Sequence, residues 1–433
     1  RATTAGGEFL SWVDGDTLAW TLGPELYRAD TAALFPPPAE PEADDEPRRG
    51  RPVATLSVTR PADKPSGTVA LTNARIVTMN DDDRVIEAGT VLLRDNRIVA
   101  VGTPEAVTVP GDAQRVDLDG RTVLPGLIDI HAHGSQADDD LVPQQNWLAL
   151  AHLALGVTTA HDPSNAASEI FAAAEYQRAG VITAPRLFST GEIIYGAKSE
   201  YFADIENFED AREHVRRLQA QGAIAVKNYN QPRREQRQMV VAAAREAGMM
   251  VVAEGASLYH MDMNLVADGN TGIEHNVPPE RFYDDMLQFW PETGVGYTPT
   301  LVVTYGGLTA QDWVYQDSDV WQHPLLSRFV PPHVLEPRAV RRPMAPASDY
   351  QPFIDAAANA RRLMERGVLV NIGAHGQREG LASHWEIWGF VLGGMSPLEA
   401  LKTATINPAR YLGLDRDLGS IEPGKLADLL VVD

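Results

Sequence analysis

The sequence predicts an α/β protein, a (β/α)8 TIM-like barrel with a small flanking β-sandwich domain, from two observations. Short apolar runs alternate with amphipathic helical stretches through the middle of the chain, as expected for eight strand–helix units. Segments with strand-like alternation and turn-forming residues flank this region on both sides. The alternative, a doubly wound open sheet, lacks the glycine-rich phosphate loop that follows an early strand in nucleotide-binding sheets.

The composition of the 433 residues is that of a globular protein, with 44% apolar and 22% charged residues. A net charge of −22 argues against nucleic-acid and membrane partners, and no apolar run approaches the roughly 18 residues that span a bilayer. We therefore expect a soluble protein, cytoplasmic or exported. Cysteine is absent, which excludes disulfides and thiol nucleophiles, so a metal site has to use His, Asp, Glu or a modified Lys.

The N-terminal residues 1–30 are predicted to form a β-hairpin, because apolar and polar positions alternate around a turn at Asp14 and Gly15. The run S-W-V-D-G-D-T-L-A-W also resembles the closing blade of TolB-like β-propellers. That resemblance implies a larger protein whose propeller region is missing from this chain; the alternative is an edge hairpin packed on the main domain. Residues 31–66 are rich in proline and acidic residues and are predicted to be a linker.

Residues 67–125 and 413–433 are predicted to form a composite β-sandwich beside a catalytic barrel of residues 126–412. An insertion at residues 303–350 carries many aromatic, proline and arginine residues and shows no helical period. Such an insertion at the C-terminal face of a barrel is typical of a lid or substrate-binding loop, with structureless decoration as the alternative. The predicted barrel strands are residues 127–133, 157–162, 186–190, 223–229, 249–254, 272–275, 295–302 and 368–375.

A pair of histidines ends the first barrel strand. His131 and His133 are two residues apart, so their side chains project from the same face and can bind one metal ion together. The pair follows the apolar run Leu127–Ile130 and the turn Pro125-Gly126, where catalytic residues of a barrel are expected. We therefore interpret it as a pair of metal ligands.

Four further strand ends carry possible ligands: Lys227, Glu254, His275 and His375. A lysine buried at a strand end is expected to deprotonate, and a neutral amine can take up carbon dioxide to give a carbamate that bridges two cations. A lysine that reaches solvent or pairs with a glutamate is the alternative. Each of the other three residues is weak evidence alone, but their convergence on one barrel mouth predicts a metal centre.

The sequence around these residues resembles the amidohydrolase superfamily. The resemblance rests on V-L-P-G-L-I-D-I-H-A-H, on A-L-K-T-A-T-I-N-P-A-R-Y-L-G-L and on G-S-I-E-P-G-K-L-A-D-L-L-V-V-D, and it covers about residues 68–433. It is similar to the imidazolonepropionase and prolidase-like branch, including members fused behind TolB-like propellers. It implies that His131 and His133 are first-strand ligands, Lys227 the carboxylated bridging lysine and His275 the sixth-strand ligand.

Two positions depart from the family pattern. Glu254 stands where the fifth strand usually supplies histidine, and His375 stands where the eighth strand usually supplies the proton-transferring aspartate. The chain also stops at Asp433, where relatives continue, so we expect it to be truncated at both ends. We expect Glu254 and His375 to be metal ligands, and His375, with Glu254 as the alternative, to carry the proton.

These observations predict a metal-dependent hydrolase that cleaves amide-type C–N bonds of a peptide, a cyclic amide or an acylated amino acid. One or two divalent ions, best matched by zinc, are expected to activate the attacking water. The expected substrate contacts are His161, Tyr229, Arg338 and Arg341, the arginines holding a carboxylate. An ester, lactone or phosphotriester hydrolase and a non-catalytic binding protein are the alternatives, and a homo-oligomer is left open.

Overall fold

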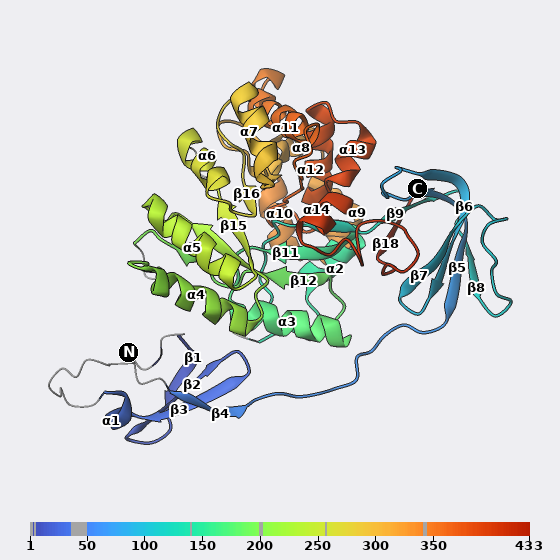
Figure 1. The fold of residues 1–433 in the computed structure, drawn as a ribbon. Coiled ribbons are helices and arrows are strands. Elements are labelled where there is room, and N and C mark those ends of the chain that lie inside the picture. Colours follow the sequence, from blue (N-terminus) through green and yellow to red (C-terminus); the bar gives the residue numbers. More distant parts are fainter. Residues whose placement is uncertain are drawn as a thin grey trace.

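The computed structural model describes residues 3, 6–35, 50–138, 141–198, 202–255, 258–340 and 344–433. Figure 1 shows a central barrel surrounded by helices, a small β domain on one side and an N-terminal sheet joined to it by a long extended segment. No helix among the described residues is long and apolar enough to cross a membrane.

The barrel strands are parallel and fall into two hydrogen-bonded groups. The first group runs β10-β11-β12 and the second β13-β14-β15-β16-β17. The predicted third strand, residues 186–190, corresponds to β12, which pairs with β11, and the short β13 that follows it pairs with β14. The strand bounds are β10 (Leu127–Asp129), β11 (Val157–Asp162), β12 (Arg186–Ser189), β13 (Ile194–Tyr195), β14 (Ala225–Tyr229), β15 (Met250–Glu254), β16 (Gly272–Glu274) and β17 (Gly296–Thr298).

The eighth predicted strand, residues 368–375, is extended but forms only an isolated parallel bridge, between Val370 and Tyr297. It closes the barrel between β17 and β10, because the His375 amide donates to the carbonyl of His131 at 2.7 Å. Regular pairing is lost because the Ala374 amide donates instead to the Asp129 carboxylate, at 3.1 Å. A side chain has replaced a neighbouring strand as the acceptor.

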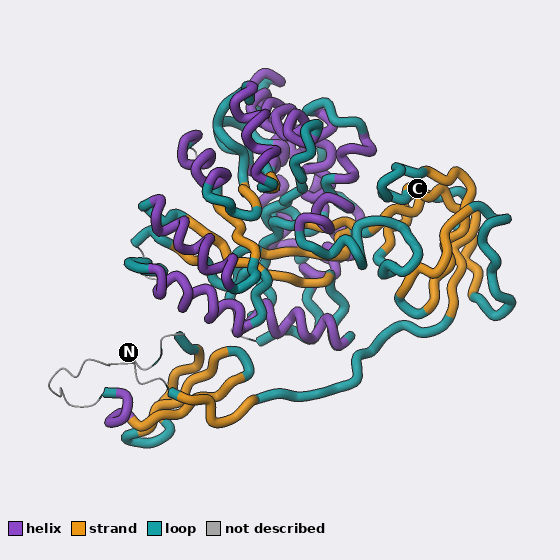
Figure 2. The backbone as a smooth tube through the Cα atoms, in the orientation of Figure 1, coloured by secondary structure: helices purple, strands orange, loops and turns teal. Residues whose placement is uncertain are grey.

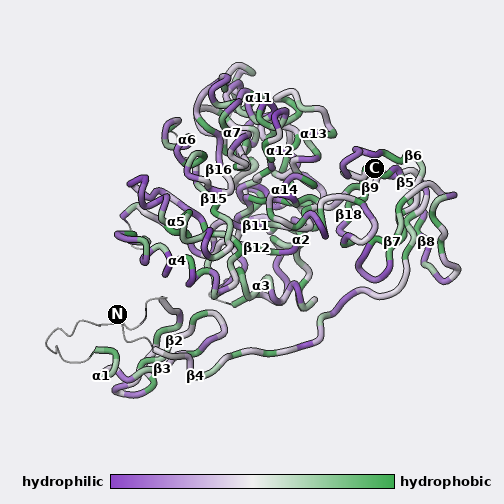
Figure 3. The backbone as a smooth tube through the Cα atoms, in the orientation of Figure 1, coloured by the Kyte–Doolittle hydropathy of each residue, from purple (hydrophilic) through white to green (hydrophobic). Residues whose placement is uncertain are grey.

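The barrel helices follow from capping and spacing, as α4 illustrates. Asn207 and Asp210 form a capping box at its start, Gly222 ends it in the left-handed conformation, and Ala211, Val215 and Leu218 form its buried stripe. Figure 3 shows the resulting alternation of hydrophilic and hydrophobic residues along α4 and α5. The helix bounds are α2 (Trp147–Ala154), α3 (Ala167–Ala179), α4 (Phe208–Gln221), α5 (Arg234–Glu246), α6 (Tyr259–Ala267), α7 (Asp284–Thr293), α11 (Gln351–Met364), α12 (Leu381–Leu392), α13 (Pro397–Lys402) and α14 (Ile406–Tyr411).

The flanking β domain joins the two ends of the catalytic region. Its sheet has six strands, and β18 (Leu429–Val432) pairs antiparallel with β9 (Thr122–Pro125), the strand that leads into the barrel. The sheet is packed by branched residues such as Ile76, Val91 and Ile98. The other strands are β5 (Thr68–Val77), β6 (Val85–Arg94), β7 (Arg97–Gly102) and β8 (Gln114–Asp117).

The N-terminal region is a four-stranded antiparallel sheet in the order β1-β2-β3-β4. Its elements are β1 (Glu8–Trp12), β2 (Thr17–Leu22), β3 (Glu25–Asp30), α1 (Thr31–Leu34) and β4 (Arg51–Thr55). Strand β4 lies inside the predicted linker 31–66; its proline, Pro52, is tolerated because β4 is an edge strand. Figure 2 shows the long loop that follows β4 and leads to β5.

The insertion at residues 303–350 is helical, so the prediction of an irregular segment was wrong. Three α-helices lie in its described part: α8 (Ala310–Asp317), α9 (Pro324–Phe329) and α10 (Pro332–Val340). Each is too short to show a clear period, and each begins with a local signal, either the Thr309–Asp312 capping box or a proline in the first turn. Tyr315, Leu326 and Leu335 bury against Trp385 of α12.

Candidate active site

Four imidazole rings meet at the C-terminal ends of the barrel strands. The centroid of the His131 ring lies 4.9 Å from that of His133, 5.0 Å from that of His275 and 4.8 Å from that of His375. The His275 and His375 rings are 5.0 Å apart. These four residues, predicted at the ends of three strands, form one group that we call the histidine cluster.

Buried carboxylates orient two of the rings. Nδ1 of His131 lies 2.6 Å from Oε2 of Glu274, and Nδ1 of His133 lies 3.0 Å from Oδ1 of Asp162. Asn165 in turn donates to the other oxygen of Asp162 at 2.7 Å. A carboxylate on one ring nitrogen fixes the ring and leaves the other nitrogen as a donor toward a metal.

The other two rings are held by unusual backbone. His275 has φ +69° and His375 has φ +54°, values that non-glycine residues seldom adopt. Thr300, whose hydroxyl lies 3.3 Å from Nδ1 of His131, has φ +53°. Strained backbone gathered in this way is typical of a functional site, where it aims side chains that a regular strand would direct elsewhere.

Lys227 and Glu254 lie next to the cluster as an ion pair. Nζ of Lys227 is 2.6 Å from Oε2 of Glu254 and 3.6 Å from Oε2 of Glu274, and Nε2 of His275 is 3.0 Å from the other oxygen of Glu254. Burial favours a neutral amine, but the charges of Glu274 and Glu254 outweigh it and raise the pKa of Lys227. In the described structure Lys227 therefore pairs with a glutamate, the alternative that the sequence left open, and its carboxylation stays a prediction.

The donor atoms fit a divalent cation. Two groups, His131 with His133 and His375, and His131 with Glu254 and His275, each place their ligand atoms within 4.8 Å of one another. Nε2 of His131, buried beside the other rings, has no hydrogen-bond partner among the described residues. Burial and the neighbouring Lys227 and histidines hold the pKa of His131 well below its usual range, so the ring is neutral and can coordinate.

Sequence reasoning missed two carboxylates in the centre, Glu274 and Asp129. Burial raises the pKa of Glu274 to about 8 and also raises that of Asp129. The Asp129 carboxylate accepts from the amides of His131 and Ala374, and therefore ties the first and eighth strands together. Alternation along the first strand places Asp129 on the same face as His131, a signal that could have found it. Glu274 gave no comparable signal.

Tyr305 was also missed, because it lies in the segment predicted to be irregular. Its ring stacks on the His275 ring with a centroid distance of 5.0 Å and an interplanar angle of 21°. The Asn276 side chain holds its backbone, accepting from the Tyr305 amide at 2.7 Å. Burial and the Glu254 carboxylate raise the pKa of its phenol, which therefore stays protonated as a hydrogen-bond donor beside the cluster.

The four expected substrate contacts differ in position. Tyr229 lies beside the cluster, its ring centroid 5.7 Å from Nζ of Lys227. His161 is fully buried, its Nδ1 lies 3.1 Å from the Ile130 carbonyl, and burial lowers its pKa to about 4. The side chain of Arg338 and all of Arg341 lie outside the described residues.

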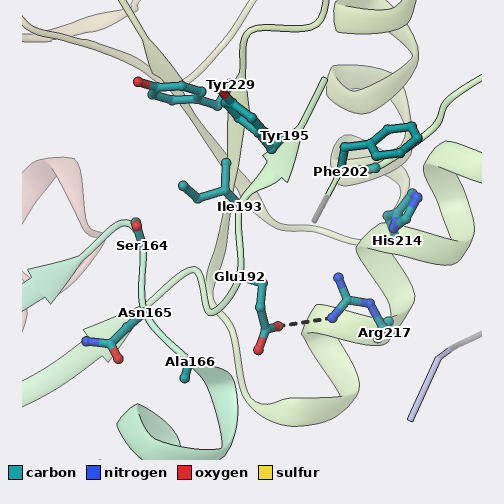
Figure 4. Close-up of a pocket in the computed structure, with 11 residues that line it drawn as sticks. Ser164, Asn165, Ala166, Glu192, Ile193, Tyr195, Phe202, His214, Arg217 and Tyr229 are labelled. Carbon is teal, nitrogen blue, oxygen red and sulfur yellow. Dashed lines mark hydrogen bonds and ion pairs between the residues drawn. The ribbon is translucent and has the colours of Figure 1, made fainter. Parts of the chain in front are cut away.

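A cavity of about 900 Å³ has Tyr229 and Asn165 in its lining, and Figure 4 shows the residues that line it. These two residues connect the cavity to the histidine cluster: Tyr229 faces Lys227, and Asn165 binds the Asp162 that orients His133. The insertion was predicted to supply substrate contacts. The described residues that line this cavity come from the loop after β11, from the segment that runs from the end of β12 through β13 to α4, and from the end of β14.

A barrel whose strand ends carry clustered imidazoles, a lysine and a glutamate belongs to the class of metal-dependent barrel hydrolases. Residues 122–433 match the Amidohydrolase family. The chain therefore belongs to the amidohydrolase family and is a hydrolase acting on C–N bonds.

Named relatives agree with this assignment. The chain is 24% identical to an imidazolonepropionase of Symbiobacterium thermophilum over 81% of this chain and 85% of that protein, and 26% identical to one of Erwinia tasmaniensis over 82% and 90%. Among solved structures, an Xaa-Pro dipeptidase with bound methionine is similar with a TM-score of 0.63, 22% identity and coverage of 84% and 94%. Phenylurea hydrolase B is similar with a TM-score of 0.63, 20% identity and coverage of 85% and 92%. These structures support the barrel fold with its flanking β domain.

Proposed function

We propose that the protein hydrolyses amide-type C–N bonds of a peptide, a cyclic amide or an acylated amino acid with a metal-activated water. The observation that carries this proposal is the histidine cluster, with Glu254 and Lys227 beside it, at the C-terminal mouth of the barrel. Relatives named imidazolonepropionase, Xaa-Pro dipeptidase and deaminase support amide-type bonds over esters, lactones or phosphotriesters.

Zinc is the cation that best matches the donors, because imidazole nitrogens and one carboxylate make up the set. When bound, such an ion lowers the pKa of water and polarises the substrate carbonyl. His131 belongs to both donor groups, so the set suits one ion or two. With two ions we propose a carbamate on Lys227 as the bridge, which electron density for a carboxyl group on its Nζ tests.

His375 is the proposed proton carrier. Burial, together with His133 and His275, lowers its pKa to about 3, so the imidazole is neutral at neutral pH but a weak base, and the proposed role rests on its position at the end of the eighth strand. Burial opposes ionisation of Glu254, but His275 and Lys227 outweigh it and lower its pKa to about 2. Glu254 therefore stays an ionised ligand held by two partners, which makes it the less suitable base.

The test combines metal analysis with a panel of substrates. We expect at least one divalent ion per chain, loss of hydrolysis of dipeptides, cyclic amides or N-acyl amino acids on chelation, and recovery on adding zinc. Full activity in metal-free protein contradicts the mechanism. If the protein hydrolyses esters, lactones or phosphotriesters but no amide, the proposed bond class is wrong. If it binds metal but hydrolyses none of these substrates, a non-catalytic binding protein is favoured.

A further inference from the structure

The cavity beside the histidine cluster has an aromatic side and a charged end. Its volume, about 900 Å³, suits a ligand considerably larger than a water or a metal-bound carbonyl. Tyr195 and Tyr229 stand together with ring centroids 5.2 Å apart, and Phe202 is partly exposed on the same lining. Figure 4 shows the Glu192–Arg217 ion pair below Tyr195 and Tyr229, with His214 between Phe202 and Arg217.

Arg217, on α4, has side-chain N–H donors that are unpaired within the described residues. Its Nη1 donates to Oε2 of Glu192 at 3.0 Å, whereas the other oxygen of Glu192 accepts from the Ala167 amide at 2.9 Å. Within the described residues, Nε and Nη2 of Arg217 have no acceptor. Both oxygens of Glu192 are therefore already paired. The groups of this ion pair that remain for a ligand are the Nε and Nη2 donors of Arg217.

Two other arginines of this chain show what such a pair of donors binds. Arg186 uses Nε and Nη2 to hold both oxygens of Asp428, at 2.8 and 3.1 Å, and Arg212 does the same with Glu246, at 2.8 and 3.0 Å. The planar guanidinium matches a carboxylate in this arrangement. Arg217 lines the cavity, and within the described residues its Nε and Nη2 have no such carboxylate partner.

The N-terminal sheet helps to hold Arg217 in place. A Cβ added to Gly6 lies 2.9 Å from Cδ of Arg217, so the backbone before β1 packs on the aliphatic stem of this arginine. Gln221, also on α4, donates to Glu8 at 2.8 Å. The side chain of Arg217 is only 20% exposed, which reduces the water that competes for its donors.

We propose that this cavity is the subsite for a carboxylate-bearing, aromatic or apolar part of the substrate, with Arg217 as its anchor. The inference rests on the proposed function, and it narrows the substrate to an N-acyl amino acid or peptide with a free carboxylate. Nε and Nη2 of Arg217 bind both oxygens of that carboxylate, the aromatic side holds the adjacent side chain, and the scissile amide reaches the histidine cluster past Tyr229. Sequence reasoning assigned the carboxylate to Arg338 and Arg341; the cavity assigns it to Arg217.

Calorimetry with a matched pair of probes measures binding to the subsite, and an assay for released phenylalanine on the same samples shows whether either probe is hydrolysed. N-Acetyl-L-phenylalanine and its amide differ only in the carboxylate. We expect the full-length protein to bind the acid roughly tenfold or more tightly than the amide, as a charge-assisted bidentate contact predicts. Arg217→Gln is expected to remove this preference, and Arg217→Lys, which keeps the charge without the fork, to retain part of it.

Arg212→Gln is the matched control, because Arg212 lies on the same helix but pairs with Glu246 outside the cavity. It is expected to keep the preference for the acid, and thermal melting verifies that each variant folds. Equal binding of both probes, no binding of either, or a preference that survives Arg217→Gln overturns the subsite. If the acid binds and no amide is hydrolysed, the proposed function fails and the subsite stands.

Discussion

The histidine cluster and the cavity beside it are built differently. In the cluster, buried carboxylates and backbone at positive φ fix each ring, and His131 and Glu274 are almost completely inaccessible. In the cavity, Arg217 is fixed by one ion pair and by contact with the N-terminal sheet. The cluster therefore suits chemistry that needs tight positioning, and the cavity suits recognition, where a small shift changes affinity without stopping the reaction.

The largest expected effect comes from removing the ring shared by both donor groups. His131→Asn should lose bound metal and lower kcat/KM by about 10³-fold or more, since Lewis-acid stabilisation is worth several kcal/mol and each decade about 1.4 kcal/mol. Metal content and kinetics on the same preparation measure this. His384→Asn, a change at a buried histidine bonded to the Leu155 carbonyl, is the control and should keep both. If metal-free His131→Asn keeps wild-type turnover, the reaction does not depend on the histidine cluster.

This contrast also explains how much the sequence could predict. His131, His133, His275 and His375 were found because each ends a short apolar run, and parallel strands bring such ends together. The strand order and the flanking β domain follow from the same periodicity. Asp129 and Glu274 were missed because their role is to contact a backbone amide or a ring from another strand, which spacing along one strand does not reveal.

The residues around the cavity were harder to predict for a related reason. Arg217 lies on the polar side of α4, where an arginine ordinarily faces solvent. Its position in a cavity wall depends on the loop after β12 and on Gly6, which are distant from it in sequence. The insertion divides between two roles: Tyr305 stacks on His275 beside the cluster, whereas Tyr315 and the short helices pack mainly on α12. Its part in substrate binding stays a prediction.

The second prediction decides the role of His375 within the cluster. If it carries the proton, His375→Asn should retain metal and lose turnover by about 10² to 10⁴, the usual contribution of general acid–base catalysis. If it is an essential ligand, metal content falls together with activity, because a ring nitrogen cannot bind metal and accept a proton at once. Retention of both metal and turnover excludes His375 from either role.

The third prediction concerns the buried support behind the cluster. Burial raises the pKa of Glu386 to about 8, although its carboxyl accepts from the Val302 amide at 2.6 Å. The folded state therefore binds a proton that the unfolded state releases near pH 4.3, and the free energy of unfolding falls as pH rises from about 4.3 to 8.

Glu386→Gln keeps an acceptor for Val302 and removes this titration. Denaturant unfolding at a series of pH values should show a smaller decrease in stability for the variant than for the wild type. Glu399→Gln is the control, because Glu399 is a surface capping residue with a lowered pKa, and it should not reduce the decrease. If the free energy of unfolding depends on pH in the same way for the wild type and for Glu386→Gln, Glu386 is not protonated in the folded state.

The smallest expected effect tests whether the N-terminal sheet contributes to the cavity. Gly6 has φ +78°, and an added Cβ lies 2.9 Å from Cδ of Arg217, so Gly6→Ala should displace the arginine stem from its position. Moving a side chain off its rotamer costs about 0.5–1.5 kcal/mol, which corresponds to roughly two- to tenfold weaker binding of a carboxylate probe. The amide probe and kcat should change little, because the histidine cluster is untouched. Gly15→Ala is the matched control in the same sheet, since an added Cβ there contacts nothing within 4 Å. If Gly6→Ala keeps the full preference for the acid, Arg217 holds its position without the N-terminal sheet. If Gly6→Ala and Gly15→Ala lose the preference equally, the effect comes from the stability of the sheet itself.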